Sequence, residues 1–482
     1  MTTERVVRRH SVRSTGRTWR RFAVALGVLG TVGGLLWWFT GPAVEVASGS
    51  PPPESLTTPL LSARRIPVWL GAATGARSLR NELQGPLSEL PESSCVLFES
   101  EGAVLVSQRS GDTVIPASNL KPLTAEAAVA LLGAETRLAT TVASSSGVGS
   151  AGQVSGDLFL IGGGDPVLST AGYEPYPGLP RNLLTPLELL ADEVVAAGVS
   201  RVTGSVVGDA SRFDDRRDAP GWEPSYITDG QVAPLSALIV DDGRNSFGGV
   251  ALDSPALGAA EVFTRLLEAR GVEIDGGPLT GAAPAATAEI ARVESPTVAE
   301  LAQELVTFSD NTTAELLVKE IGRVRKEQGS TAAGIEEIQR WAAERGITGE
   351  GTVIADGSGL SRENRLSCDS MVALLTDVGI ESPLTSWLAR PGEPGTLEDR
   401  MVGSELTGRV RAKTGSLNGV RTLAGWLLTL PERNVAFAVG ANGDDAPEEL
   451  LESLEEQILA SALSYPAVPP VEKLGPKPAR TS

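Results

Sequence analysis

An uncharged, mostly apolar run near the N-terminus determines where the rest of this chain can fold. The run, Phe22 to Phe39 (FAVALGVLGTVGGLLWWF), is 18 residues long, just enough for a helix to span a bilayer. Seven arginines precede it in residues 1–21, and such a basic flank is typical of the cytoplasmic side of a membrane segment. We expect residues 22–40 to form a transmembrane anchor, with a cleaved signal peptide as the alternative. Either segment exports everything that follows it.

Composition predicts one globular body between an N-terminal linker and a C-terminal tail. Residues 41–64 are rich in proline and serine and are expected to form a linker. Residues 464–482 contain repeated prolines and are expected to form a disordered tail. Between them, strand-like and helix-like apolar patterns alternate, which predicts a mixed α/β or α+β body.

The apolar periods predict individual elements of this body. Two strands are expected around a turn at Glu101-Gly102, and a β-hairpin is expected over Gly419–Gly440, where Pro431, Glu432 and Arg433 separate two apolar runs. Helices are expected at about 120–132, 185–197, 258–270, 297–307, 312–324, 331–345, 367–377 and 446–462.

Scarce residue types exclude several kinds of chemistry. The formal net charge is −19, so the body would repel phosphate and a nucleic-acid partner is not expected. The single histidine, His10, lies in the arginine-rich tail, which leaves no Ser-His-Asp triad and no histidine zinc site. Lysine supplies only six of the 41 basic residues. An activated nucleophile must therefore use a lysine or a carboxylate as its base, and no metal or organic cofactor is expected.

The two cysteines, Cys95 and Cys368, allow two interpretations. An exported body would meet oxidising conditions in which they can form a disulfide. Two buried free thiols are the alternative, since cysteine packs well in cores. The sequence does not decide between them.

The first candidate catalytic motif is Ser118-Asn119-Leu120-Lys121, at a predicted helix start. A spacing of three places both side chains on one helical face, where a neutral lysine amine can take the serine proton if burial lowers its pKa. Pro122 follows directly, which a first helical turn tolerates. Taken alone, Ser118 is equally explained as a helix N-cap.

The second motif, Ser309-Asp310-Asn311, is expected in a loop that enters a helix. A serine hydroxyl there can pass a proton between the lysine and a leaving amine, and an asparagine side chain offers a donor and an acceptor to a peptide backbone. The alternative is an ordinary helix cap, with Glu315 following.

The third motif, Lys413-Thr414-Gly415-Ser416, precedes the predicted hairpin. A strand edge can pair with an extended substrate, Lys413 offers a cation to a terminal carboxylate, and Gly415 permits close approach to the backbone. The alternative is a common Lys-Thr-Gly turn.

The three motifs together are far more specific, because S-x-x-K, S-D-N and K-T-G in this order are typical of class A β-lactamases and penicillin-binding proteins. Over about residues 90–462 the chain resembles the D-alanyl-D-alanine carboxypeptidase/endopeptidase group of class C low-molecular-mass penicillin-binding proteins (peptidase S13 type). Further stretches that resemble this group are DLFLIGGGDPVL (157–168), GDASRF (208–213), APLSALIVDDGR (233–244) and ADGSGLSREN (355–364).

The resemblance implies a role for each motif residue. Ser118 would be the acylated nucleophile, Lys121 its general base and Ser309 the proton relay, while Asn311 would hold the substrate backbone. Lys413 would bind the terminal carboxylate with help from Thr414, next to Gly415. The backbone N–H groups of Ser118 and Ser416 would form the oxyanion hole.

The resemblance also implies a fold and a setting. The expected fold is the penicillin-binding/serine β-lactamase-like transpeptidase fold, with a catalytic domain over 65–140 and 290–463 and an inserted accessory region over 141–289. The expected partners are peptidoglycan stem peptides ending in D-Ala-D-Ala, β-lactams as inhibitors, and the membrane through the N-terminal helix. Catalysis would take place in the cell envelope. A β-lactamase-like hydrolase and an inactive cell-wall scaffold are the alternative functions.

Overall fold

The computed structural model describes residues 68–173, 183–245, 249–443 and 447–466. The predicted anchor at 22–40 and the linker at 41–64 lie outside these residues. Within the described part of the chain, no helix is both long and apolar enough to cross a bilayer.

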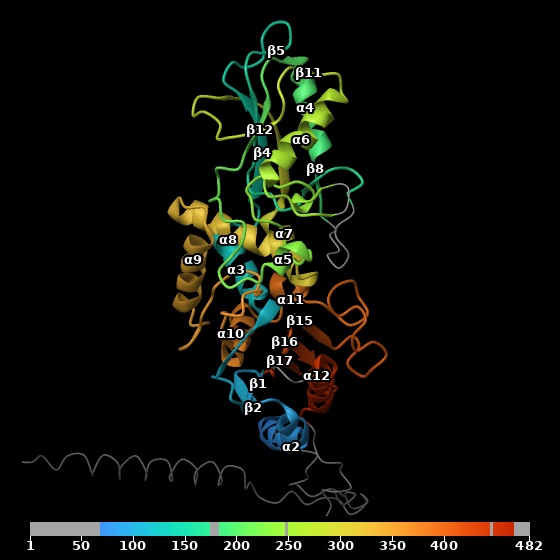
Figure 1. Ribbon diagram of the computed structural model, residues 1–482. Helices are drawn as coiled ribbons and strands as arrows, with labels where there is room; N and C mark the ends of the chain where they lie inside the picture. The colour runs from blue at the N-terminus through green and yellow to red at the C-terminus, as the bar shows by residue number, and fades with distance from the viewer. Residues whose placement is uncertain (1–67, 174–182, 246–248, 444–446, 467–482) are drawn as a thin grey trace, which may run out of the picture. The chain divides into compact units, whose positions relative to one another are not determined.

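A five-stranded antiparallel sheet, in the order β15-β16-β17-β1-β2, joins the two ends of the described chain (Figure 1). The predicted hairpin and the strand pair around Glu101-Gly102 are both confirmed within it. Its strands are β1 (Ser93–Ser100), β2 (Ala103–Gln108), β15 (Val410–Leu417), β16 (Val420–Leu428) and β17 (Asn434–Asn442).

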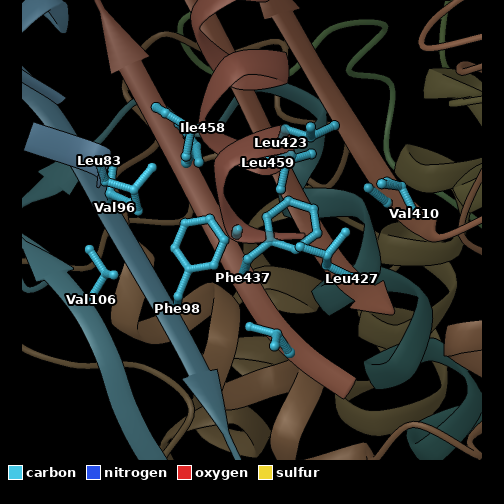
Figure 2. Close-up of a cluster of buried hydrophobic side chains, with 14 of the residues drawn as sticks. Leu83, Val96, Phe98, Val106, Val410, Leu423, Leu427, Phe437, Ile458 and Leu459 are labelled. Carbon is cyan, nitrogen blue, oxygen red and sulfur yellow. The ribbon is translucent and has the colours of Figure 1, made fainter. Parts of the chain in front are cut away.

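One face of this sheet packs against α2 (Val68–Glu89) and α12 (Glu448–Ala462). Figure 2 shows apolar side chains from both helices meeting those of the strands, with the rings of Phe98 and Phe437 stacked at a centroid distance of 5.9 Å. The sequence prediction missed α2. Its buried leucines repeat every four residues, but glycines and Pro86 interrupt the helical pattern.

The other face packs against α10 (Cys368–Val378), because side chains alternate along each strand. Cys95 points to this side and forms a disulfide with Cys368, with a Cα–Cα distance of 5.8 Å. Both residues are fully buried. The structure therefore resolves the open question of the two cysteines in favour of a bond.

A helical cluster adjoins this side of the sheet and confirms the helices predicted there, with ends that shift by a few residues. These helices are α3 (Lys121–Leu132), α7 (Val298–Thr307), α8 (Asn311–Lys326) and α9 (Thr331–Glu344). The cluster also contains the short α11 (Pro383–Trp387), which the sequence analysis did not predict. Pro122 lies in the first turn of α3, where its missing N–H has no helical partner to lose.

A second sheet lies between the first two motifs and has its own apolar core, covered by α4 (Leu187–Ala196) and α6 (Pro255–Glu268). Its strand order is β12-β10-β6-β4-β13. The strands are β4 (Arg137–Ser144), β6 (Leu158–Ile161), β10 (Val206–Asp209), β12 (Leu279–Thr280) and β13 (Ala288–Thr297).

Short elements complete the described chain. They are β3 (Thr113–Val114), β5 (Gln153–Val154), β7 (Leu168–Ser169), β8 (Thr185–Pro186), β9 (Arg201–Val202), β11 (Glu273–Ile274), β14 (Leu366–Ser367), α5 (Ser225–Thr228) and the 3₁₀ helices η2 (Ala117–Leu120) and η3 (Asp241–Gly243).

The C-terminal tail is predicted to begin at residue 464, but the folded body continues beyond that residue. Tyr465 is buried in the core that α2 and α12 share, and Pro466 lies close to Gly75 of α2. Burial of the Tyr465 ring holds residues 465 and 466 against α2, although Pro466 follows directly. Residues 467–482 lie outside the described part.

Candidate active site

The fold brings the first two motifs together around the amine of Lys121. Lys121 is the first residue of α3, directly after the η2 turn that carries Ser118, and Asn311 is the first residue of α8. The Lys121 Nζ atom donates to Ser118 Oγ at 2.8 Å, to Asn311 Oδ1 at 2.6 Å and to the carbonyl oxygen of Ser358 at 2.7 Å.

The environment of Lys121 lowers the pKa of its amine. The side chain is fully buried, and burial lowers its pKa to about 8, against the opposing charges of Asp356, Glu315 and Asp310. An amine whose pKa lies near neutral pH, and which contacts a serine hydroxyl, can accept the hydroxyl proton in its uncharged form.

The segment that carries Ser118 is held in a special backbone conformation. Ala117 has a positive φ of 45°, which is rare for a residue with a side chain and is found mainly where surrounding contacts fix it. Ser118 is not an N-cap, because Pro116 and Leu120 occupy the cap positions of η2 and α3. The capping interpretation of this serine is therefore wrong.

The second motif divides its tasks between neighbouring residues. Asp310 caps α8 by accepting from the N–H groups of Thr312 and Thr313, as the sequence allowed. Within this motif, Asn311 contacts Lys121 through its Oδ1 atom. Its Nδ2 atom donates to the carbonyl oxygen of Gln231 at 2.7 Å. Ser309 is half-buried and has a left-handed φ of 66°.

The third motif lies on β15, at the edge of the five-stranded sheet. Lys413 is fully buried and donates to the carbonyl oxygen of Thr414 at 2.8 Å. Burial, and next the charge of Lys121, hold the pKa of Lys413 well below its usual range. Thr414 is half-buried and Ser416 is exposed.

Gly415 marks the point where β15 meets the serine segment. A Cβ there would lie 2.2 Å from Thr422 Oγ1 and 2.7 Å from the carbonyl oxygen of Pro116, so no side chain fits. Thr422 itself donates to that Pro116 oxygen and accepts from Asn119. Strands β15 and β16 thus fix the approach of η2 to the sheet.

A loop within residues 355–364, which sequence analysis named only as a stretch resembling the family, also contacts the amine. Its Ser358 supplies the carbonyl oxygen that accepts from Lys121, and Glu315 of α8 accepts from the N–H groups of Gly357 at 2.9 Å and Ser358 at 2.7 Å. Glu315 is fully buried, and burial, with the nearby Asp356, raises its pKa. The available signal was its position four residues after Asn311, on the same face of α8.

Asp356 organises the same loop. Its carboxylate accepts from the N–H groups of Gly359 at 2.8 Å and Ser361 at 2.6 Å. It also accepts from the side chains of Asn364 at 2.8 Å and Trp222 at 2.9 Å. These hydrogen bonds hold the loop that carries the Ser358 carbonyl.

Residues between the first two motifs form ion pairs with side chains of α8. Arg212 pairs with Glu320 at 2.5 Å, and the fully buried Lys319 pairs with Asp214. These pairs connect the interval that carries the second sheet to the helix that begins with Asn311. Among the described residues, no cluster of three or more His, Cys, Asp or Glu side chains is arranged to hold a metal.

Comparison with known proteins finds relatives over most of the chain. The model of the D-Ala-D-Ala carboxypeptidase 3 (S13) family matches residues 84–248 and 246–460. A D-alanyl-D-alanine carboxypeptidase from an Actinomadura species is 30% identical, over 79% of this chain and 84% of its own. Carboxypeptidase DacB of Mycolicibacterium smegmatis is 32% identical, over 88% of this chain and 94% of its own.

A solved structure gives the same fold. The crystal structure of penicillin binding protein 4 from Haemophilus influenzae aligns with a TM-score of 0.68 at 21% identity, and covers 79% of this chain and 99% of its own. The mixed α/β body is therefore a penicillin-binding fold. With the family model matching most of its length, the chain belongs to the D-Ala-D-Ala carboxypeptidase 3 (S13) family.

Proposed function

We propose that this protein is a serine D-Ala-D-Ala carboxypeptidase and endopeptidase that cleaves peptidoglycan peptides through an acyl-enzyme on Ser118. The observation that carries the proposal is the buried amine of Lys121, 2.8 Å from the Ser118 hydroxyl. The relatives named as D-alanyl-D-alanine carboxypeptidases support this substrate class.

The neighbours of Lys121 determine which way a proton can move. The oxygens of Asn311 and Ser358 can only accept, so they take the two N–H bonds of a neutral amine. The lone pair is then left facing Ser118. As the Ser118 oxygen attacks the substrate carbonyl carbon, its proton passes to Lys121. The leaving amine then takes up a proton through Ser309, and water later hydrolyses the ester.

The backbone and the third motif would stabilise charge on the substrate. The N–H groups of Ser118 and Ser416 are the proposed donors to the oxyanion of the tetrahedral intermediate. Lys413, with Thr414, would bind the terminal carboxylate of the substrate. An arriving carboxylate favours the charged form of Lys413, which burial otherwise opposes.

The setting follows from the same function. The catalytic domain would comprise the parts of the body on either side of the second sheet, and the region that carries this sheet, from β4 to β13, would be accessory. We propose that residues 22–40 hold the body on the outer side of the cytoplasmic membrane, close to its peptidoglycan substrate. β-Lactams would inhibit by acylating Ser118; the Haemophilus influenzae protein is known in complex with one.

The test is covalent labelling of the body from about residue 50. A fluorescent penicillin should add one mass adduct to the wild type and none to Ser118→Ala, because only the serine oxygen forms the ester. A folded wild type that forms no adduct would contradict the proposal. Rapid turnover of a chromogenic β-lactam would instead favour the β-lactamase-like alternative.

A further inference from the structure

Two cavities lie near β15, one at its C-terminal end and one beside the segment that pairs with Ala412. The first, of about 690 Å³, is lined by Ser416, Leu417 and Asn418 at the C-terminal end of the strand. The second, of about 490 Å³, is lined by Phe308, Ala389 and Arg390, among others. The Ser118 segment meets β15 between them, at Gly415.

The second cavity adjoins two of the motifs directly. Phe308 precedes Ser309 in the chain, and Ala389 accepts from the N–H of Ala412 at 2.9 Å, next to Lys413. Its walls are α7 and the segment 386–394. Thr307 joins these walls at the end nearest the motifs, since its hydroxyl donates to the carbonyl oxygen of Trp387 at 2.7 Å.

The position of Lys413 indicates which half of a substrate reaches this cavity. In the proposed reaction Lys413 binds the carboxylate of the residue that leaves, while the acyl half lies on the other side of Ser118. The leaving half therefore extends toward Ala412 and Ala389. A single leaving D-alanine needs little room, whereas this cavity has the volume of pockets that hold drug-sized ligands.

The chemistry of the walls fits a peptide that carries both charges. Arg390 has a buried Nε donor without a hydrogen-bond partner among the described residues, and a guanidinium is suited to a carboxylate. Glu393 pairs with the Nη1 atom of Arg390 at 3.5 Å, and Glu300 of α7 lies 4.0 Å from Arg137. Both carboxylates are partly exposed and keep this wall attractive to an ammonium group. Gln303 of α7 lies on the same wall and is exposed.

We propose that the cavity between α7 and residues 386–394 binds the leaving half of a cross-linked peptide, with a carboxylate of that peptide on Arg390. This inference rests on the proposed function and assigns its endopeptidase branch to a particular subsite. Release of a terminal D-alanine would not use the cavity.

The test compares two substrates on Arg390→Ala and Gln303→Trp, the second of which fills the cavity. We expect kcat/KM for a cross-linked muropeptide dimer to fall about tenfold or more in both variants. Arg390→Ala removes the charge-assisted hydrogen bond, and Gln303→Trp removes the space for the leaving peptide. Release of D-alanine from a stem pentapeptide, and acylation by fluorescent penicillin, should stay within about twofold, as a loss restricted to the leaving side requires. Gln303→Ala is the control, because it removes the side chain without filling the space.

The outcomes separate this inference from the proposed function. A wild type that releases D-alanine but leaves the dimer intact would overturn the inference, as would an equal loss on both substrates. Unchanged dimer cleavage in both variants would also overturn it. Absence of the penicillin adduct would instead reject the proposed function itself.

Discussion

The side-chain oxygen of Asn311 lies 2.6 Å from the Nζ atom of Lys121 and joins residues 190 positions apart. The orientation of the amide is determined on its other side, where Nδ2 donates to the carbonyl oxygen of Gln231. Because that carbonyl can only accept, the Asn311 oxygen must face the amine. A neutral amide thus contacts the proposed base without adding charge.

Replacing this amide by a carboxylate tests the relationship. Asn311→Asp places a negative charge on Lys121, which favours the protonated amine and raises its pKa. Penicillin acylation at pH 7 should fall about tenfold, for a pKa rise of about one unit, and should recover partly as the pH is raised. The measurement is the acylation rate against pH. A variant with the wild-type profile would show that the contact does not influence the base.

The wild-type pH profile follows from the lowered pKa of Lys121. The neutral, proton-accepting form grows as pH rises and predominates above about 8. The second-order rate of acylation should therefore rise about tenfold per pH unit below this value and level off above it. Stopped-flow labelling between pH 5.5 and 9.5 measures this. Lys121→Arg should abolish labelling throughout, because arginine stays protonated; a flat wild-type profile would argue against lysine as the base.

Glu315 should position Lys121 through the loop that both contact. Glu315→Ala removes the acceptor for the Gly357 and Ser358 N–H groups and frees the carbonyl that holds the amine. Acylation should fall at least about tenfold with little change in penicillin affinity, since the loss concerns the transition state. Glu315→Gln keeps the acceptor oxygen and should retain most of the rate.

A matched variant on the same helix distinguishes positioning from simple destabilisation. Glu320 is also buried on α8 but pairs with Arg212 rather than with the loop. Glu320→Gln should lower the melting temperature while leaving the acylation rate of the folded protein near that of the wild type. If Glu315→Ala behaved in the same way, its role would be stability alone.

Short side-chain motifs indicated where the proposed chemistry lies, because the spacing of Ser118 and Lys121 brings their side chains together within a single turn. The Ser358 carbonyl escaped prediction, since a backbone oxygen leaves no residue-type signal. The contact of Glu315 with the loop was not predicted for another reason: a glutamate near a helix start is equally explained by capping. The helix α2 was missed because Pro86 and its glycines interrupt the pattern. The roles of the motif residues remain predictions that the labelling experiments address.

The disulfide between Cys95 and Cys368 should stabilise the body without taking part in catalysis. It closes a sequence separation of 273 residues and joins β1 to the start of α10, within the core between the sheet and this helix. Replacing both cysteines by alanine should lower the free energy of unfolding by about 2–5 kcal/mol, because the unfolded chain gains freedom. Urea unfolding of the wild type and the double variant measures this difference.

Two controls separate this effect from damage to the site. The penicillin acylation rate of the folded double variant should match that of the wild type within about twofold, because both cysteines belong to the apolar core between the sheet and α10. A reducing agent added to the native protein should act slowly, since both cysteines are fully buried and a thiolate needs access to the bond. Equal unfolding midpoints for the two proteins would contradict the stabilising role, whereas a lost adduct on a folded double variant would connect the bond to the active site.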